Sequence, residues 1–301
     1  MIRYSGIRLA IFPLLVCVIG WLFLLSLDAV AVFERLANIS TDKEKTLTMH
    51  FSLDDTINIF KELSHASYES AFQQETLRQL RRLHDSYGAV FSLYCYYSDG
   101  SSFDLSQMDE RYADEFSRNS SWLRFSFHAY SPNDDENSSA EQEVKMYELT
   151  MGELRRITGG ALDTYARFHR FRGSQNVINI LSRHSDYPLE GLYTADDLRE
   201  SYGLSLAEQV LVRKCGRCLI RGVIYQRTDL RIERGNSSSL DVLFLTNRGG
   251  CEAIEIFTHE WYLSPDVFRC IEMYFAELGE LGYRPSFGRG LRERVGEEKN
   301  P

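Results

Sequence analysis

The chain contains 301 residues, of which 44% are hydrophobic and 26% are charged, and its formal net charge is −9. These values are those of an ordinary globular protein, and the length allows one large domain or two smaller ones. A nucleic-acid-binding protein would need a basic face, so the acidic balance argues against a nucleic-acid partner. Six cysteines are too few for a disulfide scaffold at this length.

An apolar segment without charged residues lies near the start of the chain, from Leu9 to Leu27. Its length is close to the ~20 residues that a helix needs to span a bilayer, and Arg3 and Arg8 precede it. Positive charge on that flank predicts a cytoplasmic N-terminus and an exported remainder, periplasmic or extracellular. Because the run is longer than the usual signal-peptide core of about 7–15 residues, we expect an uncleaved membrane anchor. The alternatives are secretion after cleavage near Ala31 and a buried core helix.

The sequence divides into four expected regions. They are an anchor or signal segment at 1–33, a polar linker at 34–45, a folded domain at 46–287 and a charged, disordered tail at 288–301.

The folded domain begins with TLTMHFSLDD (46–55), in which apolar and polar residues alternate. A period of two is typical of a strand with two chemically different faces. Further strands are expected at 89–97, 122–128, 166–171, 191–197, 222–233 and 251–261. Helices are expected at 64–87, with Gly88 as the stop, at 104–119, 144–157, 176–182 and 206–213, and after the N-cap and first-turn pair Ser264 and Pro265.

Strands that alternate with helices imply parallel pairing through right-handed crossovers. The expected strands are semi-polar, whereas a doubly wound sheet buries both strand faces in apolar material. A barrel turns one face of each strand toward a core whose upper layer can be polar. We therefore expect an α/β fold with an irregular barrel.

Several expected strands end in groups that can bind a metal ion or move a proton. They are Asp54 and Asp55, His128, Arg167 and His169, Asp196 and Asp197, and His259. In a parallel barrel all strand C-termini open on one face, so these groups would converge there. One Asp and two His form a ligand set suited to zinc or a similar divalent ion, with open positions for water and substrate.

Each of these residues also has a structural interpretation. Adjacent Asp54 and Asp55 could cap the following helix, and His128 or His169 could be a hydrogen-bonded structural histidine. His259 could pack against Trp261. Asp196 and Asp197 favour a turn or a supporting pair over metal ligation.

Four segments occur in the order of the motifs of the polysaccharide deacetylases with a NodB-type domain, the carbohydrate esterase 4-like superfamily. They are FSLDD (51–55), FSFHAYSP (125–132), RFHRFRGS (167–174) and IFTHEW (256–261). The chain resembles an uncharacterised, divergent branch of that superfamily over roughly residues 46 to 285. The resemblance implies an irregular (β/α)7 barrel and metal-dependent hydrolysis of an N- or O-acetyl group on a carbohydrate.

The same resemblance implies a role for individual residues. Asp54 matches the general base and Asp55 a metal ligand. His128 matches the first histidine of the family's HxxxH metal motif. Arg167 matches the arginine that orients the base, and His259 matches the late histidine that acts as general acid.

One position departs from the family pattern. The second histidine of HxxxH would stand four residues after His128, where this chain has Pro132. His169 could supply the missing imidazole, Asp134 could supply a carboxylate, or no metal binds. We expect His169, because it lies on an expected strand on the same face as Arg167.

The leading functional hypothesis is a membrane-anchored or exported hydrolase that uses a divalent ion, expected to be Zn²⁺, to deacetylate a carbohydrate. The alternative is a catalytically inactive barrel that serves as a glycan-binding or scaffold protein, which Pro132 favours. A glycosyltransferase or phosphatase ranks third, because the sequence lacks a glycine-rich phosphate loop.

Overall fold

The structure is a computed structural model that describes residues 46–134, 138–197, 199–233, 239–247 and 252–288. The expected anchor at 1–33 and linker at 34–45 lie outside the described residues, as does the expected tail at 288–301 apart from its first residue. Among the helices that the structure describes, none combines the length and the apolar character that crossing a bilayer requires.

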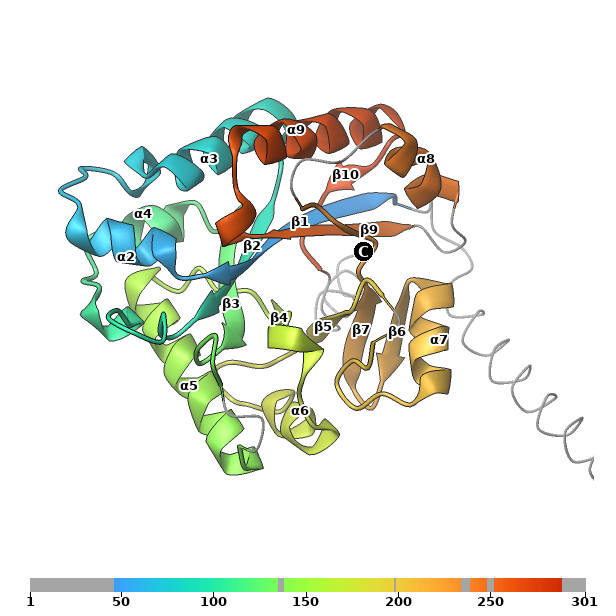
Figure 1. The fold of residues 1–301 in the computed structure, drawn as a ribbon, viewed down its shortest axis with the longest axis horizontal. Helices are drawn as coiled ribbons and strands as arrows, with labels where there is room; N and C mark the ends of the chain where they lie inside the picture. Colours follow the sequence, from blue (N-terminus) through green and yellow to red (C-terminus); the bar gives the residue numbers. More distant parts are fainter. Residues whose placement is uncertain (1–45, 135–137, 198, 234–238, 248–251, 289–301) are drawn as a thin grey trace, which may run out of the picture. The chain divides into compact units, whose positions relative to one another are not determined.

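A six-stranded sheet contains the segment that opens the folded domain (Figure 1). Its strand order is β3-β2-β1-β9-β8, with β10 also paired to β1, and each of these pairings is parallel. The strands are β1 (Thr48–Thr56), β2 (Phe91–Tyr96), β3 (Leu123–Ala129), β8 (Leu230–Arg231), β9 (Ala253–His259) and β10 (Arg284–Pro285).

A second sheet has four strands in the order β4-β5-β7-β6. Its strands are β4 (Tyr165–Ala166), β5 (Gly191–Thr194), β6 (Arg217–Ile220) and β7 (Val223–Arg227). β6 pairs antiparallel with β7, and the sequence analysis did not expect a strand at 217–220. An isolated bridge between Phe125 and Leu162 connects β3 to the segment before β4.

The α/β class and the parallel pairing of most strands agree with the sequence analysis. The described strands are hydrogen-bonded into two sheets rather than one closed ring, so the expected barrel is not established by their pairing.

The helices lie along the outside of these sheets, with α3 and α9 side by side over the first sheet and α5 against β3 (Figure 1). The α-helices are α2 (Asn58–His65), α3 (Glu75–Tyr87), α4 (Ala113–Arg118), α5 (Ala140–Ile157), α6 (Gln175–Leu181), α7 (Leu206–Cys215), α8 (Ser239–Asn247) and α9 (Pro265–Glu280). The short 3-10 helices are η2 (Ala71–Gln73), η3 (Leu105–Gln107), η4 (His169–Phe171) and η5 (Glu260–Tyr262).

Two expected helix ends are confirmed. Gly88 ends α3 with a left-handed backbone, φ 65°, which glycine adopts without steric cost. The Ser264 hydroxyl accepts a hydrogen bond from the backbone N–H of Val267, and Pro265 occupies the first turn of α9.

The expected single helix at 64–87 was wrong. A helix begins earlier, at Asn58, and the chain then turns before α3 begins. The Glu260 carboxylate accepts hydrogen bonds from the backbone N–H groups of Ile57, Asn58 and Ile59 at 2.7–3.0 Å. This cap comes from about 200 residues further along the chain, so no local pattern could indicate where α2 begins.

Three expected strands are shorter than the sequence suggested. The segment 166–171 keeps two strand residues, in β4, and then turns through η4, where Arg170 and Phe171 have positive φ values of 56° and 57°. The segment 191–197 ends as a strand at Thr194, and 222–233 divides into β7 and β8.

Both faces of β1 are buried, and they differ in chemistry as the alternation predicted. Phe51, on one face, packs against Phe91 and against Phe275 of α9. The other face carries His50, Ser52 and Asp54, which are 3%, 0% and 2% exposed. The polar face therefore lies inside the protein rather than in solvent, and its groups need protein partners.

Candidate metal and catalytic site

The carboxyl end of β1 positions two adjacent carboxylates with different partners. Asp55 has a left-handed backbone, φ 59°, and the β1–β2 register shifts between Leu53 and Thr56. Asp54 accepts a hydrogen bond from Arg167, whereas Asp55 contacts His128, Tyr96 and Trp261. A non-glycine residue in this conformation is uncommon and tends to occur where the surroundings hold a functional group in place.

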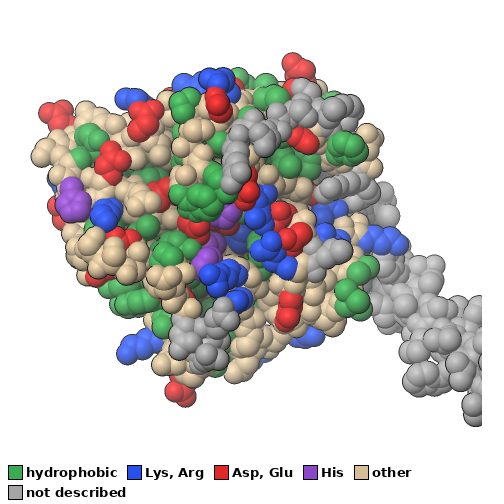
Figure 2. Space-filling model, viewed as in Figure 1, with side chains coloured by type: hydrophobic (Ala, Val, Ile, Leu, Met, Phe, Trp, Pro, Cys, Tyr) green, Lys and Arg blue, Asp and Glu red, His purple; other side chains and the backbone are tan. Residues whose placement is uncertain are grey.

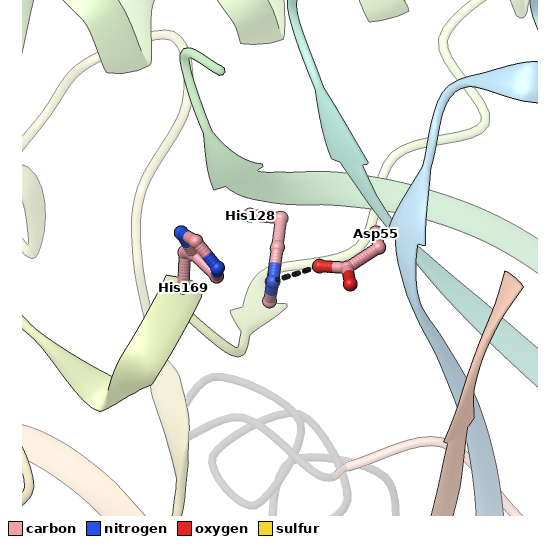
Figure 3. Close-up of side chains that lie close together, drawn as sticks. All are labelled: Asp55, His128 and His169. Atoms are coloured by element: carbon pink, nitrogen blue, oxygen red, sulfur yellow. Dashed lines mark ion pairs between the residues drawn. The ribbon is translucent and has the colours of Figure 1, made fainter. Parts of the chain in front are cut away.

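Asp55, His128 and His169 meet in one place, and we call them the candidate metal cluster (Figure 3). One ligand atom from each lies within 4.8 Å of the others, and Asp55 Oδ1 is 3.0 Å from His128 Nε2. The residues come from the end of β1, from β3 and from η4. His169 therefore reaches the cluster from a 3-10 turn, so its expected position on a strand was wrong.

The donor set fits a divalent ion. His128 Nδ1 donates a hydrogen bond to the backbone carbonyl of Arg167, which leaves Nε2 directed at Asp55. Metal-binding histidines commonly use one ring nitrogen in this way, to fix the orientation of the other. A carboxylate and two imidazoles are ligands that zinc and similar ions prefer.

The three groups differ in how easily they lose a proton. Burial would raise the pKa of Asp55, but the hydrogen bond and charge of His128 and the hydrogen bonds from Tyr96 and Trp261 hold it well below its usual range. Burial lowers the pKa of His169 to about 4. Burial also acts to lower the pKa of His128, but Asp55 and Asp54 outweigh it and the pKa is raised. A metal ion would thus meet an ionised Asp55 and a neutral His169, and would displace the proton on His128 Nε2.

Arg167 holds Asp54 from inside the protein. Its guanidinium is fully buried, and Nη1 donates to Asp54 Oδ1 at 2.9 Å and to Ser52 Oγ at 2.7 Å. The other terminal nitrogen, Nη2, donates to Glu255 Oε1 at 2.9 Å. Because the Arg167 carbonyl also accepts from His128, this one residue positions the candidate base and a candidate metal ligand.

Glu255 and His50 belong to the same buried assembly, and the sequence analysis missed both. Glu255 Oε2 is 2.6 Å from His50 Nδ1, and His50 Nε2 is 2.9 Å from Ser92 Oγ. Ser92 in turn donates to the carboxylate of Asp163. Both ring nitrogens of His50 therefore have a side-chain partner inside the protein.

We call Arg167, Asp54, Ser52, Glu255 and His50 the Arg167 network. The sequence carried one signal for it, because Glu255 interrupts the apolar run of Ala253, Ile254 and Ile256. A charged residue inside an otherwise apolar strand needs a buried partner.

His259 lies across from Asp54 in the β1–β9 register. Its ring packs 5.2 Å from that of Trp261, and its Nδ1 has no hydrogen-bond partner among the described residues. Burial lowers its pKa, although the charges of Asp54 and Asp55 oppose the shift.

The remaining expected groups lie in other contacts. Asp134 accepts hydrogen bonds from the backbone of Tyr130 and Ser131, as in a turn, and is not part of the cluster. Asp196 pairs with Arg231, and Asp197 pairs with Arg199. The expectation that these two acids form a turn or supporting pair agrees with their contacts.

A cavity of about 120 Å³ adjoins His128 and His169. Apolar side chains form much of its wall, including Phe127, Met146, Phe168, Val177 and Leu181, and Pro132 also lines it. Figure 2 shows histidine, acidic and basic side chains gathered near the middle of one face of the molecule. The cluster therefore has space beside it for a bound molecule.

No family model and no curated protein matches the chain. Among solved structures, it is similar to the Xyl-CE4 domain of a multidomain xylanase from the hindgut metagenome of Trinervitermes trinervoides. The identity is 12% and the TM-score 0.45, over 85% of this chain and 93% of that one.

Two further structures give similar values. A family 4 acetyl xylan esterase from Clostridium thermocellum, in complex with a cobalt ion, is 12% identical with a TM-score of 0.45, over 84% of this chain and 93% of that one. A peptidoglycan deacetylase from Bacillus subtilis is 12% identical with a TM-score of 0.43, over 81% and 89%. At TM-scores below 0.5, these similarities do not assign an activity to the chain.

Proposed function

We propose that the protein is a metal-dependent hydrolase that removes an N- or O-acetyl group from a carbohydrate. The observation that carries this proposal is the convergence of Asp55, His128 and His169 beside Asp54 and its buried arginine partner. The resemblance of the four sequence motifs to the polysaccharide deacetylases supplies the substrate class. The irregular (β/α)7 barrel remains the fold that this resemblance implies.

The candidate metal cluster would hold a divalent ion, for which we propose Zn²⁺. When bound, such an ion supplies Lewis-acid polarisation of the acyl carbonyl and lowers the pKa of a water molecule. Asp55 keeps its negative charge, and the hydrogen bond from His128 Nδ1 to the Arg167 carbonyl keeps Nε2 directed at the site.

Asp54 would act as the general base. Arg167 fixes the carboxylate through the 2.9 Å bond to Oδ1, and Oδ2 would take a proton from the attacking water. As the water oxygen bonds to the acyl carbon, the bond from that carbon to the leaving nitrogen or oxygen breaks.

His259 would protonate the leaving group. Burial lowers its pKa, so its protonated form gives up a proton readily. Its place opposite Asp54 in the strand register would put base and acid at the same end of the sheet.

We also propose that residues 46–287 form the catalytic domain and that the apolar segment within 1–33 anchors it to a membrane, with the domain exported. Secretion after cleavage near Ala31 is the alternative. Fractionation of cells that express the full chain, with protease protection of intact membranes, tests the two.

The proposed function is tested by acetate release from acetylated xylan, chitin and peptidoglycan fragments. We expect Asp54→Asn to retain the bound metal and to lose at least about 100-fold in turnover, the lower end of the range for a general base. The matched control is Asp197→Asn, which changes an acid that pairs with Arg199. A metal-loaded chain without turnover on any of these substrates would contradict the proposal.

A second candidate is an inactive barrel that binds glycans, because Pro132 stands where the family has its second metal histidine. It predicts glycan binding without acetate release, and unchanged binding in the Asp54→Asn variant.

A further inference from the structure

Trp261 joins the candidate site to the protein surface. Its indole is 59% exposed, although it belongs to a segment whose neighbour Glu260 is buried. The indole Nε1–H donates a hydrogen bond to Asp55 Oδ2 at 2.7 Å. One edge of the ring is thus fixed to a candidate metal ligand, while much of the ring remains in solvent.

The segment that carries Trp261 is held firmly. The Glu260 carboxylate binds three backbone N–H groups at the start of α2. The Trp261 ring also contacts two aromatic neighbours. Its centroid lies 3.7 Å from that of Tyr262 and 5.2 Å from that of His259. A ring that is already ordered loses little conformational entropy when a ligand binds.

Exposure alone would not distinguish Trp261, because scattered apolar side chains are normal on protein surfaces. The distinguishing feature is its place beside the reacting groups. Its ring adjoins the proposed acid, His259, and its N–H binds Asp55, so a ligand that covers the ring would lie next to both.

A sugar ring has the chemistry that such a surface recognises. A pyranose presents C–H groups on its faces and hydroxyl groups around its edge. Aromatic side chains bind apolar faces, and convergent polar groups at the same site bind the edge. A flat, exposed indole with carboxylate and imidazole groups beside it meets both requirements.

We propose that Trp261, supported by Tyr262, is a binding platform for a pyranose ring of the substrate, adjacent to the acyl group that is removed. The inference rests on the proposed function for the identity of the ligand. It adds a residue that carries the binding of the sugar rather than the chemistry of the acyl group.

The test measures the binding of oligosaccharides that carry no acetyl group, so that turnover plays no part. The probes are xylotetraose, cellotetraose and the chitosan tetramer, titrated into the metal-loaded full chain by calorimetry. We expect at least one to bind, and Trp261→Ala to weaken that binding by about tenfold or more, as for a central aromatic contact. Trp261→Phe keeps an aromatic face and should bind within about threefold of the parent chain.

Two controls distinguish a direct role of Trp261 in sugar binding from a structural role in the site. Phe244→Ala removes another exposed aromatic ring, 69% exposed on α8 and outside the candidate site, and should leave binding unchanged. Metal affinity should fall similarly in Trp261→Phe and Trp261→Ala, because both lose the N–H bond to Asp55.

If Trp261→Ala does not fold, the fluorescence of the parent chain provides the readout. The other tryptophans are Trp21 and Trp122, so a change on sugar binding should disappear in Trp261→Phe.

Unchanged sugar binding in Trp261→Ala, or equal losses in Trp261→Phe and Trp261→Ala, would overturn the proposal, as would the absence of binding by all three probes. Failure of the proposed function has a different signature. If sugar binding depends on Trp261 but the metal-loaded chain releases no acetate, the sugar-binding role of Trp261 stands and the proposed hydrolase activity is contradicted.

Discussion

The candidate metal cluster and the Arg167 network both include residues of β1, yet they are built differently. In the Arg167 network, Arg167 and Glu255 are fully buried, and each carboxylate has a cationic partner. In the cluster, the Asp55 side chain is 15% exposed and His169 lies on a turn with left-handed residues. The network is thus enclosed by protein, whereas the cluster borders the surface.

Asp54 and Asp55 are adjacent in the chain, but their side chains enter different surroundings. Asp54 faces inward to Arg167, and Asp55 faces His128 and Trp261 at the rim. The left-handed backbone at Asp55 allows adjacent carboxylates to enter separate environments. In the proposed function, this separation places a fixed base, Asp54, beside the proposed metal ligand Asp55.

Loss of the central cation should have the largest effect on stability. Arg167→Met leaves Asp54 and Glu255 buried without their shared partner, and we expect about 3–5 kcal/mol of destabilisation. Chemical denaturation measures the free energy of unfolding. The matched control is Arg199→Met, which removes an exposed ion pair with Asp197 and should change stability by no more than about 1 kcal/mol. Equal losses of unfolding free energy in Arg167→Met and Arg199→Met would contradict the larger contribution expected of the buried Arg167 network.

In the candidate metal cluster, a substitution should lower metal affinity rather than stability. His169→Ala removes a proposed ligand from an η4 turn and should weaken zinc binding by about 100-fold or more, with little change in unfolding free energy. A competition titration with a chelator measures the affinity. His184→Ala, which removes a histidine paired with Glu148 outside the cluster, is the control. Unchanged affinity in His169→Ala would remove this histidine from the site.

The sequence analysis reached these two regions unequally. The alternation in β1 indicated two faces. The polar groups at the ends of the expected strands, together with the resemblance to the polysaccharide deacetylases, made Asp55, His128 and His169 the candidate ligands. It could not show that the polar face of β1 is buried, because the partners of His50 lie on β2 and β9. His50 and Glu255 were accordingly not among the candidate residues.

Local backbone conformation was a second feature that the sequence could not predict. His169 was expected on a strand, but two left-handed residues directly after it turn the chain away. Such conformations are not indicated by Arg and Phe, which seldom adopt them. Closure of the strands into a barrel was also beyond the local pattern, because it depends on how strand edges meet far apart in the sequence.

Within the network, Glu255 and His50 should be energetically coupled. Glu255→Gln replaces the carboxylate that contacts both His50 and Arg167 by an amide, and His50→Gln removes the imidazole beside Glu255 Oε2. A double-mutant cycle should give about 1–3 kcal/mol of coupling, with the double variant less destabilised than the sum of the single ones. Additive effects would mean that the two residues act independently.

The smallest expected effect is the pH dependence of metal affinity. His128 must lose the proton on Nε2 to bind a metal ion, and its pKa lies above the usual value of 6.5. Below that raised pKa, affinity should fall by about tenfold for each pH unit, since one proton competes with the ion. Above it, affinity should level off. In the metal-free Asp55→Asn variant the main cause of the raised pKa is lost, so the pKa of His128 should be lower than in the metal-free parent chain. A profile that is flat between pH 6 and 9 would be inconsistent with His128 as a ligand.

The metal content of the purified, metal-replete chain tests the central claim most directly. Elemental analysis should find about one equivalent of a divalent ion per chain, and that equivalent should be lost in Asp55→Ala and kept in Asp197→Asn. A folded chain that retains no ion, or one whose ion persists in Asp55→Ala, would contradict the convergence of Asp55, His128 and His169 on a single cation.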